Sequence, residues 1–325
     1  MGVASWNALS AAKAPALPPG TDWTYRTTLS STAWGTNVVW GSNWNGSQFL
    51  VVGGSGAAAT SPDGITWTYR SGLASGWLSS ANAMKINWNG SQYAVIGRAG
   101  NFSTSPDGVT WTHQPGLSAT AWGTGDGLFL AWDGSQYCAI GQGGLCATSP
   151  DGVTWTYQSG LSATSWGASS GPIAWNGSVF CAVGSADACA TSPDGVTWTY
   201  QNGLSVTGWA GNSGNDLNWN GSQFCVIGQG GAIATSPDGV TWTYQSGLSA
   251  TAWGSSPGTS VIWTGSLWAA GGFQGRFATS SDAVTWTYQS NLAATSYGTN
   301  PVRNIAWNGN TFIVAGNNGL LATSP

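Results

Sequence analysis

The sequence predicts an all-β fold, a seven-bladed β-propeller with four antiparallel strands in each blade. Three observations support this prediction: seven sequence repeats, four strand-like segments within each repeat, and chain ends that complement one another. The tryptophan of the recurring segment Ser-Pro-Asp-Gly-Val-Thr-Trp returns at spacings of 44, 44, 44, 43, 44 and 44 residues. A repeat of about 40–45 residues with four strands is typical of a propeller blade. These tryptophans are Trp23, Trp67, Trp111, Trp155, Trp198, Trp242 and Trp286.

The unit that ends at Tyr244 illustrates the four predicted strands. The first strand spans residues 217–219, and an Asn-Gly pair then predicts a two-residue type I′ turn. The second strand, residues 223–227, is apolar along its whole length, so we expect both of its faces to be buried. The third strand, residues 232–235, follows a glycine-rich turn. The fourth, residues 240–244, consists of β-branched and aromatic residues, which favour strands.

The two ends of the chain supply complementary parts of one blade. The last unit stops at Pro325, just before its fourth strand, whereas the chain opens with such a strand around Trp23. The N-terminal strand is therefore expected to complete the C-terminal blade and close the ring, which leaves no free sheet edge there. The predicted organisation is an Ala- and Pro-rich arm, residues 1–17, followed by a single propeller domain, residues 18–325.

The recurring Ser-Pro-Asp-Gly-Val-Thr-Trp segment resembles a known motif. It is similar to the Asp-box of sialidase-like (BNR-like) repeat propellers, Ser-x-Asp-x-Gly-x-Thr-Trp, with one residue fewer between Asp and Gly. The resemblance implies that the motif forms the turn between the third and fourth strands and is structural, remote from any active site. We call these six segments the Asp-box turns. Their aspartates are Asp63, Asp107, Asp151, Asp194, Asp238 and Asp282.

Composition excludes several classes of protein. Charged residues make up 6% of the chain and hydrophobic residues 41%, so the chain lacks the high charge and low hydrophobicity of disordered proteins. A net charge of −4 without a basic cluster excludes a charge-driven nucleic-acid binder. The sequence also shows no membrane span and no secretory signal. We therefore expect a protein that is cytoplasmic, virion-associated or released by a non-Sec route; the sequence does not indicate its oligomeric state.

The sequence predicts no catalytic residue, no cofactor and no metal site, and hence no enzyme. A sialidase-like site would need three converging arginines, but the five arginines occupy several different positions of the repeat. The only histidine, His113, stands where neighbouring units have tyrosine, so we expect it on an outer strand rather than in a catalytic or metal site.

The five cysteines stand at positions that other units fill with Ala, Leu, Ile or Phe. Cys138 and Cys146 have the same spacing as Cys181 and Cys189, and Cys225 stands apart. This interchange favours core side chains that are dispensable for folding. Cross-strand disulfides are the alternative.

A further ring of aromatics precedes the first strand of each unit, in the connection between blades. This crossover is the longest loop of the unit and varies most between units, as in residues 123–130, 210–217 and 254–261. Counting turns along the unit places it on the same face as the glycine-rich turns. Exposed tryptophan beside Asn, Ser and Thr would suit a sugar, so these aromatics are the predicted carbohydrate-binding residues; the alternative is that they wedge between blades as core. They are Trp34, Trp77, Trp122, Trp166, Trp209, Trp253 and Tyr297.

Two functions fit these features of the sequence. The first is a non-enzymatic, multivalent glycan-binding propeller of the lectin or adhesin type, because repeated weak sites gain avidity. The alternative is a structural or decoration protein of a larger assembly such as a phage virion or tail, which the low charge would suit. The expected partners are accordingly glycans or other structural proteins. A glycan array tests the first function, and copurification with particles tests the second.

Overall fold

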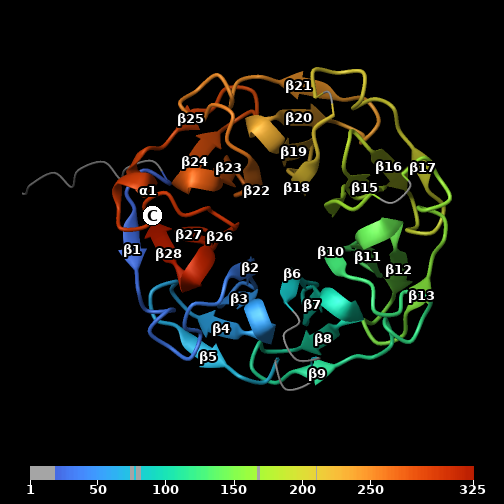
Figure 1. Ribbon diagram of the computed structural model, residues 1–325, viewed down its shortest axis with the longest axis horizontal. Helices are drawn as coiled ribbons and strands as arrows, with labels where there is room; N and C mark the ends of the chain where they lie inside the picture. The colour runs from blue at the N-terminus through green and yellow to red at the C-terminus, as the bar shows by residue number, and fades with distance from the viewer. Residues whose placement is uncertain (1–18, 74–76, 78–81, 167–168, 210) are drawn as a thin grey trace, which may run out of the picture.

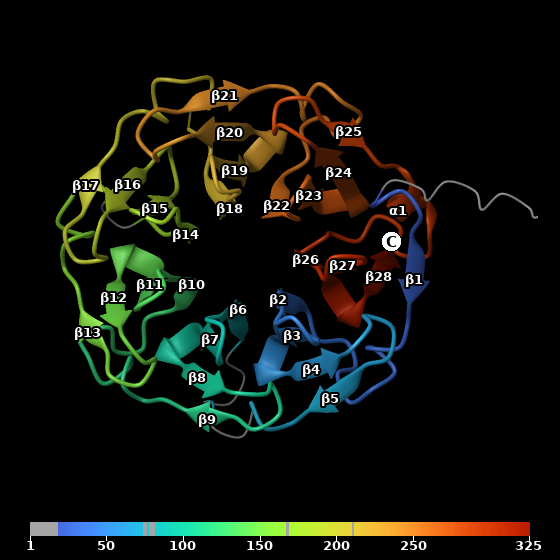
Figure 2. The same ribbon diagram turned by 180° about the vertical axis from the view of Figure 1, so that it is seen from behind.

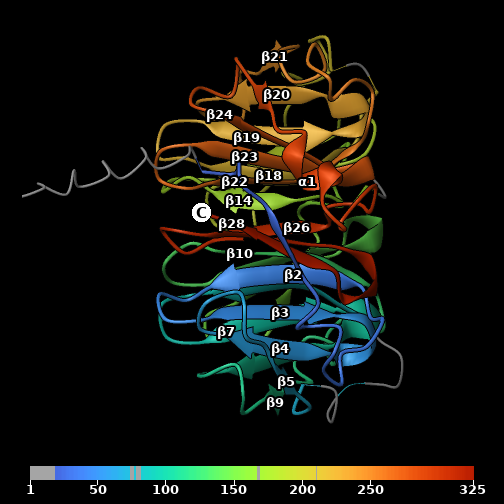
Figure 3. The ribbon, with the colours of Figure 1, turned by 90° about the vertical axis from the view of Figure 1, so that its left-hand side faces the viewer.

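The computed structural model describes residues 19–73, 77, 82–166, 169–209 and 211–325. It confirms the seven-bladed propeller: seven antiparallel sheets of four strands stand around a central axis (Figure 1). The same ring is seen from behind in Figure 2 and edge-on in Figure 3. The predicted arm, residues 1–17, lies outside the described residues.

Within each blade the strands follow one another from the central channel to the rim. The inner strands are β2 (Val39–Trp44), β6 (Ala83–Trp88), β10 (Gly127–Trp132), β14 (Ile173–Trp175), β18 (Gly214–Trp219), β22 (Gly258–Trp263) and β26 (Asn304–Trp307). The second strands are β3 (Phe49–Gly53), β7 (Tyr93–Gly97), β11 (Tyr137–Gly141), β15 (Phe180–Val183), β19 (Phe224–Gly228), β23 (Trp268–Gly272) and β27 (Phe312–Ala315). The third strands are β4 (Ala58–Ser61), β8 (Phe102–Ser105), β12 (Cys146–Ser149), β16 (Cys189–Ser192), β20 (Ile233–Ser236), β24 (Arg276–Ser280) and β28 (Leu321–Ser324). The outer strands are β5 (Thr68–Arg70), β9 (Thr112–His113), β13 (Thr156–Tyr157), β17 (Thr199–Tyr200), β21 (Thr243–Gln245), β25 (Thr287–Tyr288) and β1 (Thr24–Arg26).

Short 3₁₀ turns join second to third strands in six blades: η1 (Gly54–Gly56), η3 (Arg98–Gly100), η4 (Gln142–Gly144), η5 (Gln229–Gly231), η6 (Phe273–Gly275) and η7 (Asn317–Gly319). One α-helix, α1 (Asn291–Ala294), lies in the last crossover. No helix in the described part of the chain is long and apolar enough to cross a membrane.

The N-terminal strand closes the ring as predicted. β1 pairs antiparallel with β28, and Thr24 stands opposite Thr323. Just before β1, the backbone N–H of Gly20 donates to the carbonyl of Pro325 at 3.1 Å, so the two chain ends are joined directly. Trp23 is buried and meets Phe277 of the neighbouring blade edge-on, with ring centroids 4.8 Å apart. The closing strand therefore stabilises both its own sheet and a contact between blades.

The turn between first and second strands differs from the predicted two-residue type I′ turn. The paired residues Trp219 and Phe224 enclose four residues, and the side-chain oxygen of Asn220 accepts the N–H groups of Ser222 and Gln223 at 2.9 and 2.7 Å. Only the glycine of the Asn-Gly pair has a positive φ, 97° at Gly221. The asparagine side chain, rather than a left-handed asparagine backbone, closes the turn.

Each Asp-box turn lies between third and fourth strands, where the resemblance implied. In the turn of Asp238, one carboxylate oxygen accepts the N–H groups of Val240 and Thr241 at 2.8 and 2.7 Å. Partial burial raises the pKa of Asp238. The hydrogen bonds from these backbone donors and from the hydroxyl of Ser236 together lower it by more, so the net shift is downward. Because the N–H groups of Val240 and Thr241 are bonded to Asp238, they cannot pair with β20. The outer strand β21 therefore starts at Thr243 rather than at the predicted residue 240.

The connections alternate between the two faces of the disc, as antiparallel order requires. Asn-Gly turns and Asp-box turns share one face, which we call the Asp-box face; 3₁₀ turns and crossovers share the other, the crossover face. Hydrogen bonds confirm the second grouping, because Gly100 of η3 donates to the carbonyl of Gly125 in the following crossover at 2.8 Å.

The hydrophobic core lies between the blades. One cluster joins Cys181 and Val183 of one blade to Phe224 and Val226 of the next, and six similar clusters complete the ring. All five residues of β19 are buried, which confirms the prediction that the second strand is covered on both faces.

The cysteines are core residues, as their interchange with apolar residues predicted. All five are buried free thiols. The sulfurs of Cys138 and Cys146 are 3.9 Å apart, but the residues stand diagonally, since Cys138 faces Thr148 across the strand pair. The thiol of Cys146 and complete burial both raise the pKa of Cys138, which disfavours the reactive thiolate.

Candidate functional site

The predicted carbohydrate-binding ring is buried. The exposed fractions are 8% for Trp77, 3% for Trp122, 2% for Trp166 and zero for Trp34, Trp209, Trp253 and Tyr297. Each of these aromatic rings belongs to one of the seven core clusters between blades. For five of the six tryptophans the indole N–H donates to a carbonyl of its own crossover, as from Trp253 to Ser256 at 2.9 Å, whereas Trp77 donates to the hydroxyl of Ser103. The prediction of sugar-stacking plates on these residues is wrong, and the alternative of core side chains is correct.

A glycine in each unit makes room for the buried ring. A Cβ atom on Gly272 would lie 2.5 Å from the ring of Trp253, so any side chain there would collide with it. The same approach occurs in every blade, and the sequence carried this signal as a glycine at one fixed position after the second strand's apolar run. These glycines are Gly53, Gly97, Gly141, Gly184, Gly228, Gly272 and Gly316.

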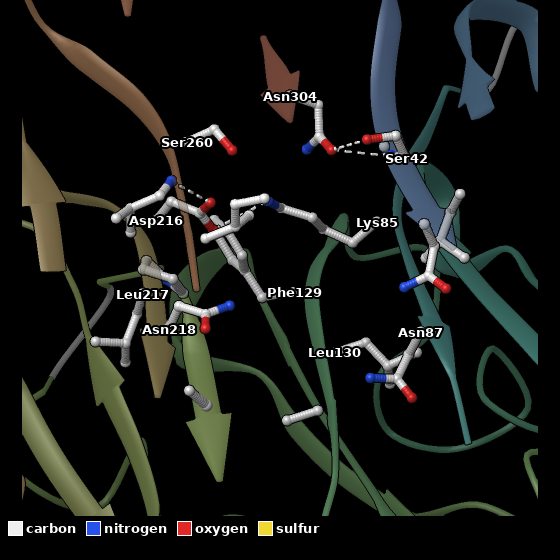
Figure 4. A pocket seen from close by; sticks show the side chains of 18 of the residues that line it. Ser42, Lys85, Asn87, Phe129, Leu130, Asp216, Leu217, Asn218, Ser260 and Asn304 are labelled. Atoms are coloured by element: carbon white, nitrogen blue, oxygen red, sulfur yellow. Dashed lines mark hydrogen bonds and ion pairs between the residues drawn. The ribbon is translucent and has the colours of Figure 1, made fainter. Parts of the chain in front are cut away.

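The inner strands enclose a cavity of about 480 Å³ along the propeller axis. Figure 4 shows that its side chains come from strands on opposite sides of the ring. Each inner strand ends in a half-buried tryptophan near the Asp-box face, and six of these line the cavity. We call these six the rim tryptophans: Trp44, Trp132, Trp175, Trp219, Trp263 and Trp307.

An ion pair spans the channel. The ammonium of Lys85 on β6 lies 3.2 Å from the carboxylate of Asp216 on β18 (Figure 4). The second oxygen of Asp216 accepts the backbone N–H of Val261 at 3.0 Å, so the carboxylate is held from two sides. The side chains of Lys85 and Asp216 are 23% and 14% exposed.

Between this ion pair and the rim tryptophans lies the part of the channel that we call the lower chamber. Asn43, Asn87 and Asn218 stand one residue before the terminal tryptophans of their strands. Among the described residues, the side-chain oxygens of Asn43, Asn87 and Ser260 have no hydrogen-bond partner. Ser260 is only 1% exposed, so its hydroxyl is a buried polar group without a partner.

On the crossover side of the ion pair lies a second cavity of about 290 Å³, which we call the vestibule. Its walls are mainly apolar and carry two basic side chains. The lining residues are Trp40, Met84, Lys85, Leu128, Phe129, Asn215, Gln229, Thr259, Phe273 and Arg303.

Arg303 stands between two aromatic rings of the vestibule. Its guanidinium carbon is 5.2 Å from the ring centroids of both Trp40 and Phe273, within the range of cation–π attraction. Its Nε donates to the side-chain oxygen of Asn317 at 3.2 Å. Partial burial lowers the pKa of Arg303, with a smaller opposing effect from Tyr297.

The near-identical units differ most where they line the vestibule and the ion-pair level. Four residues before each terminal tryptophan stand Trp40, Met84, Leu128, Gly171, Asn215, Thr259 and Arg303. Three residues before it stand Gly41, Lys85, Phe129, Pro172, Asp216, Ser260 and Asn304. Both positions thus hold seven different residue types. The sequence analysis identified the variable crossover segments, but it predicted that the aromatic residue recurring in each of them binds the ligand. A comparison of the units position by position would have identified the residues that line the vestibule.

The two faces of the disc differ in charge. The Asp-box turns contribute six aspartates, the turn at Asp133 a seventh and the turn before β1, at Asp22, an eighth, and no Lys or Arg lies in any described turn of that face. The backbone hydrogen bonds that lower the pKa values of the Asp-box aspartates keep them ionised. An anionic partner is therefore repelled from the Asp-box face, whereas the crossover face carries both signs, with Arg98 and Arg276 as well as Asp126 and Asp187.

Nothing in the described chain resembles a metal centre, since no group of three His, Cys, Asp or Glu side chains gathers there. His113 lies on the outer strand β9, opposite Ser103, as expected of a replaced tyrosine.

Fold and site together define a seven-bladed propeller with a chemically varied central channel. No protein-family model and no curated protein sequence matches the chain. Solved structures match its fold. One, described as YCF48 bound to D1 peptide, has a TM-score of 0.65 at 15% identity and covers 94% of both chains. YCF48 from Cyanidioschyzon merolae has a TM-score of 0.63 at 15% identity, covering 93% of this chain and 98% of that one. A chain of the mitotic checkpoint complex has a TM-score of 0.62 at 12% identity, covering 99% and 98%.

Proposed function

We propose that this protein is a non-enzymatic binding propeller that holds one partner segment in the vestibule. The observation that carries the proposal is the divergence of otherwise near-identical blades at the two positions that line the vestibule and the level of the ion pair. A closed ring holds these side chains on rigid strands, so a varied lining creates one asymmetric site from a symmetric scaffold.

The partner we propose is a peptide segment of another protein. The vestibule offers apolar and aromatic walls for side chains, such as Trp40, Met84 and Leu128. Of its five polar side chains, Asn215 and Thr259 already donate to backbone carbonyls, which leaves fewer groups for a sugar's many hydroxyls. A propeller of similar fold is described as bound to a peptide, which supports the same class of ligand here.

Selection of displayed random peptides on the immobilised protein tests this function. We expect peptides with dissociation constants on the order of micromolar, whose affinity falls at least tenfold in Trp40→Ala and Leu128→Asp. Val206→Ala is the matched control. Val206 is 82% exposed on a crossover, and the substitution introduces the alanine that other units have at this position. Selected peptides that bind both vestibule variants as tightly as the unchanged protein would contradict the proposal.

Glycan recognition is the second candidate, now for a single site in the lower chamber. The favouring observation is the combination of rim tryptophans with the unpaired oxygens of Asn43 and Asn87. Aromatic rings suit a sugar's C–H face and these oxygens accept its hydroxyls. A glycan array tests it: binding should be lost in Asn87→Ala and unchanged in Trp40→Ala. The assembly role stays a prediction, tested by copurification with particles.

A further inference from the structure

The vestibule holds more positive than negative charge. Lys85 and Arg303 both line it, and Asp216 is the carboxylate paired with Lys85. Arg303 has no carboxylate within ion-pair distance among the described residues. The site therefore has one uncompensated cation in partly apolar surroundings, where an opposite charge is attracted more strongly than in water.

Arg303 presents its donors in a restricted direction. Trp40 and Phe273 lie beside the guanidinium, and Nε is engaged by Asn317. No partner for its terminal nitrogens is found in the described part of the chain, so the outer edge of the guanidinium remains able to donate. Such an edge matches the two oxygens of a carboxylate.

Lys85 can bind a second anion while Asp216, its present partner, stays in place. Asp216 is held independently by the backbone N–H of Val261, so it keeps its position when Lys85 shifts. An ammonium has three donors, and Asp216 accepts only one of them at 3.2 Å. The flexible lysine stem passes Phe129, whose ring centroid is 5.5 Å from the ammonium.

We infer that the vestibule binds a carboxylate attached to an apolar body. The carboxylate lies between the ammonium of Lys85 and the guanidinium of Arg303, and the apolar part packs against Met84 and Leu128. The occupant is a peptide segment with a carboxylate beside an aromatic or aliphatic side chain. This inference rests on the proposed function and names the chemistry of its partner. Carboxylate is favoured over other anions because Lys85 already pairs with one, in Asp216.

Two small probes isolate the carboxylate. N-acetyl-phenylalanine carries an aromatic ring and a carboxylate, and N-acetyl-phenylalaninamide is the same molecule without the charge. Titration calorimetry on the full chain should show the acid binding at least tenfold more tightly than the amide, since hydrogen bonds between charged groups are the strong ones. Equal affinity of the two probes, or no binding of either at concentrations on the order of 10 mM, would overturn the inference.

Charge variants locate the binding. Lys85→Met alone leaves Asp216 buried without its partner, so the double variant Lys85→Met with Asp216→Asn is the sound test of the lysine. We expect it to abolish the preference for the acid, whereas Asp216→Asn alone should raise the affinity for the acid several-fold by removing the resident competitor. Arg98→Met is the matched control: Arg98 is a cation of the crossover face outside the vestibule, with a 52% exposed side chain.

Each outcome separates this inference from the proposed function. A preference for the acid that survives the double variant, or that is lost equally in Arg98→Met, refutes the carboxylate site. If selected peptides depend on Trp40 and Leu128 but tolerate every charge variant, the binding function stands and only the carboxylate chemistry fails. Circular dichroism and the unfolding temperature of each variant verify that the propeller is intact.

Discussion

A chain without residues 1–26 is expected to lose a large part of its stability. The deletion removes β1, and with it the three residue pairs that β1 forms with β28 and the buried ring of Trp23. Removing a buried tryptophan side chain alone costs about 3–5 kcal/mol, and domains of ordinary stability have about 5–15 kcal/mol in total. We expect the unfolding temperature to fall by roughly 10 °C or more. The exposed edge of β28 should also promote association of the truncated chain.

The matched control is a chain that lacks only residues 1–18. It keeps β1, the hydrogen bond from Gly20 to Pro325 and the contact between Trp23 and Phe277. Thermal unfolding and size-exclusion chromatography of the two truncated chains therefore isolate the closing strand. If both chains melt at the temperature of the full protein, ring closure by β1 contributes no stability.

Replacing Trp122 by alanine is expected to destabilise the protein by about 3–5 kcal/mol. The ring is 3% exposed, its N–H donates to the carbonyl of Gly125 at 3.0 Å, and it packs over Gly141. Truncation would leave a cavity in the core between two blades and a carbonyl without its donor. An exposed carbohydrate-binding ring, which was one of the two interpretations of the sequence, would instead have allowed the same replacement in an intact fold.

Denaturant unfolding measures this cost, with Val206→Ala as the control. Val206 lies in the corresponding part of another crossover and is exposed, so its truncation should change the free energy of unfolding by no more than about 0.5 kcal/mol. A Trp122→Ala protein that unfolds at the same denaturant concentration as the unchanged chain would mean that the ring is not part of the core.

The architecture could be predicted from the sequence because every blade repeats the same turn motifs and the same strand patterns. The recurring turns, the apolar second strand and the complementary ends act over short stretches or between equivalent units, so they can be recognised without the fold. Strand ends were less predictable: β18 starts at Gly214, three residues before the predicted 217, since an inner strand continues for as long as its neighbour β19 offers partners.

The environment of each tryptophan ring could not be predicted from its spacing. Trp209 and Trp219 recur with equal regularity, yet Trp209 is fully buried whereas Trp219 is half-buried at the channel rim. Burial depends on what packs over a side chain, and a crossover that folds back over its own ring is a tertiary event. The glycine opposite each buried ring, such as Gly228 for Trp209, was a visible signal whose meaning only the fold explains.

By itself, the sequence determined the class, the number of blades and the strand that closes the ring. Only the tertiary structure decided where binding could occur. Lys85 and Asp216 are 131 residues apart and meet because ring closure brings distant inner strands around one axis. Arg303 and Trp40 belong to the last and first complete units and face each other for the same reason. Repeats encode what each blade is, but a site shared by several blades exists only once the ring has formed.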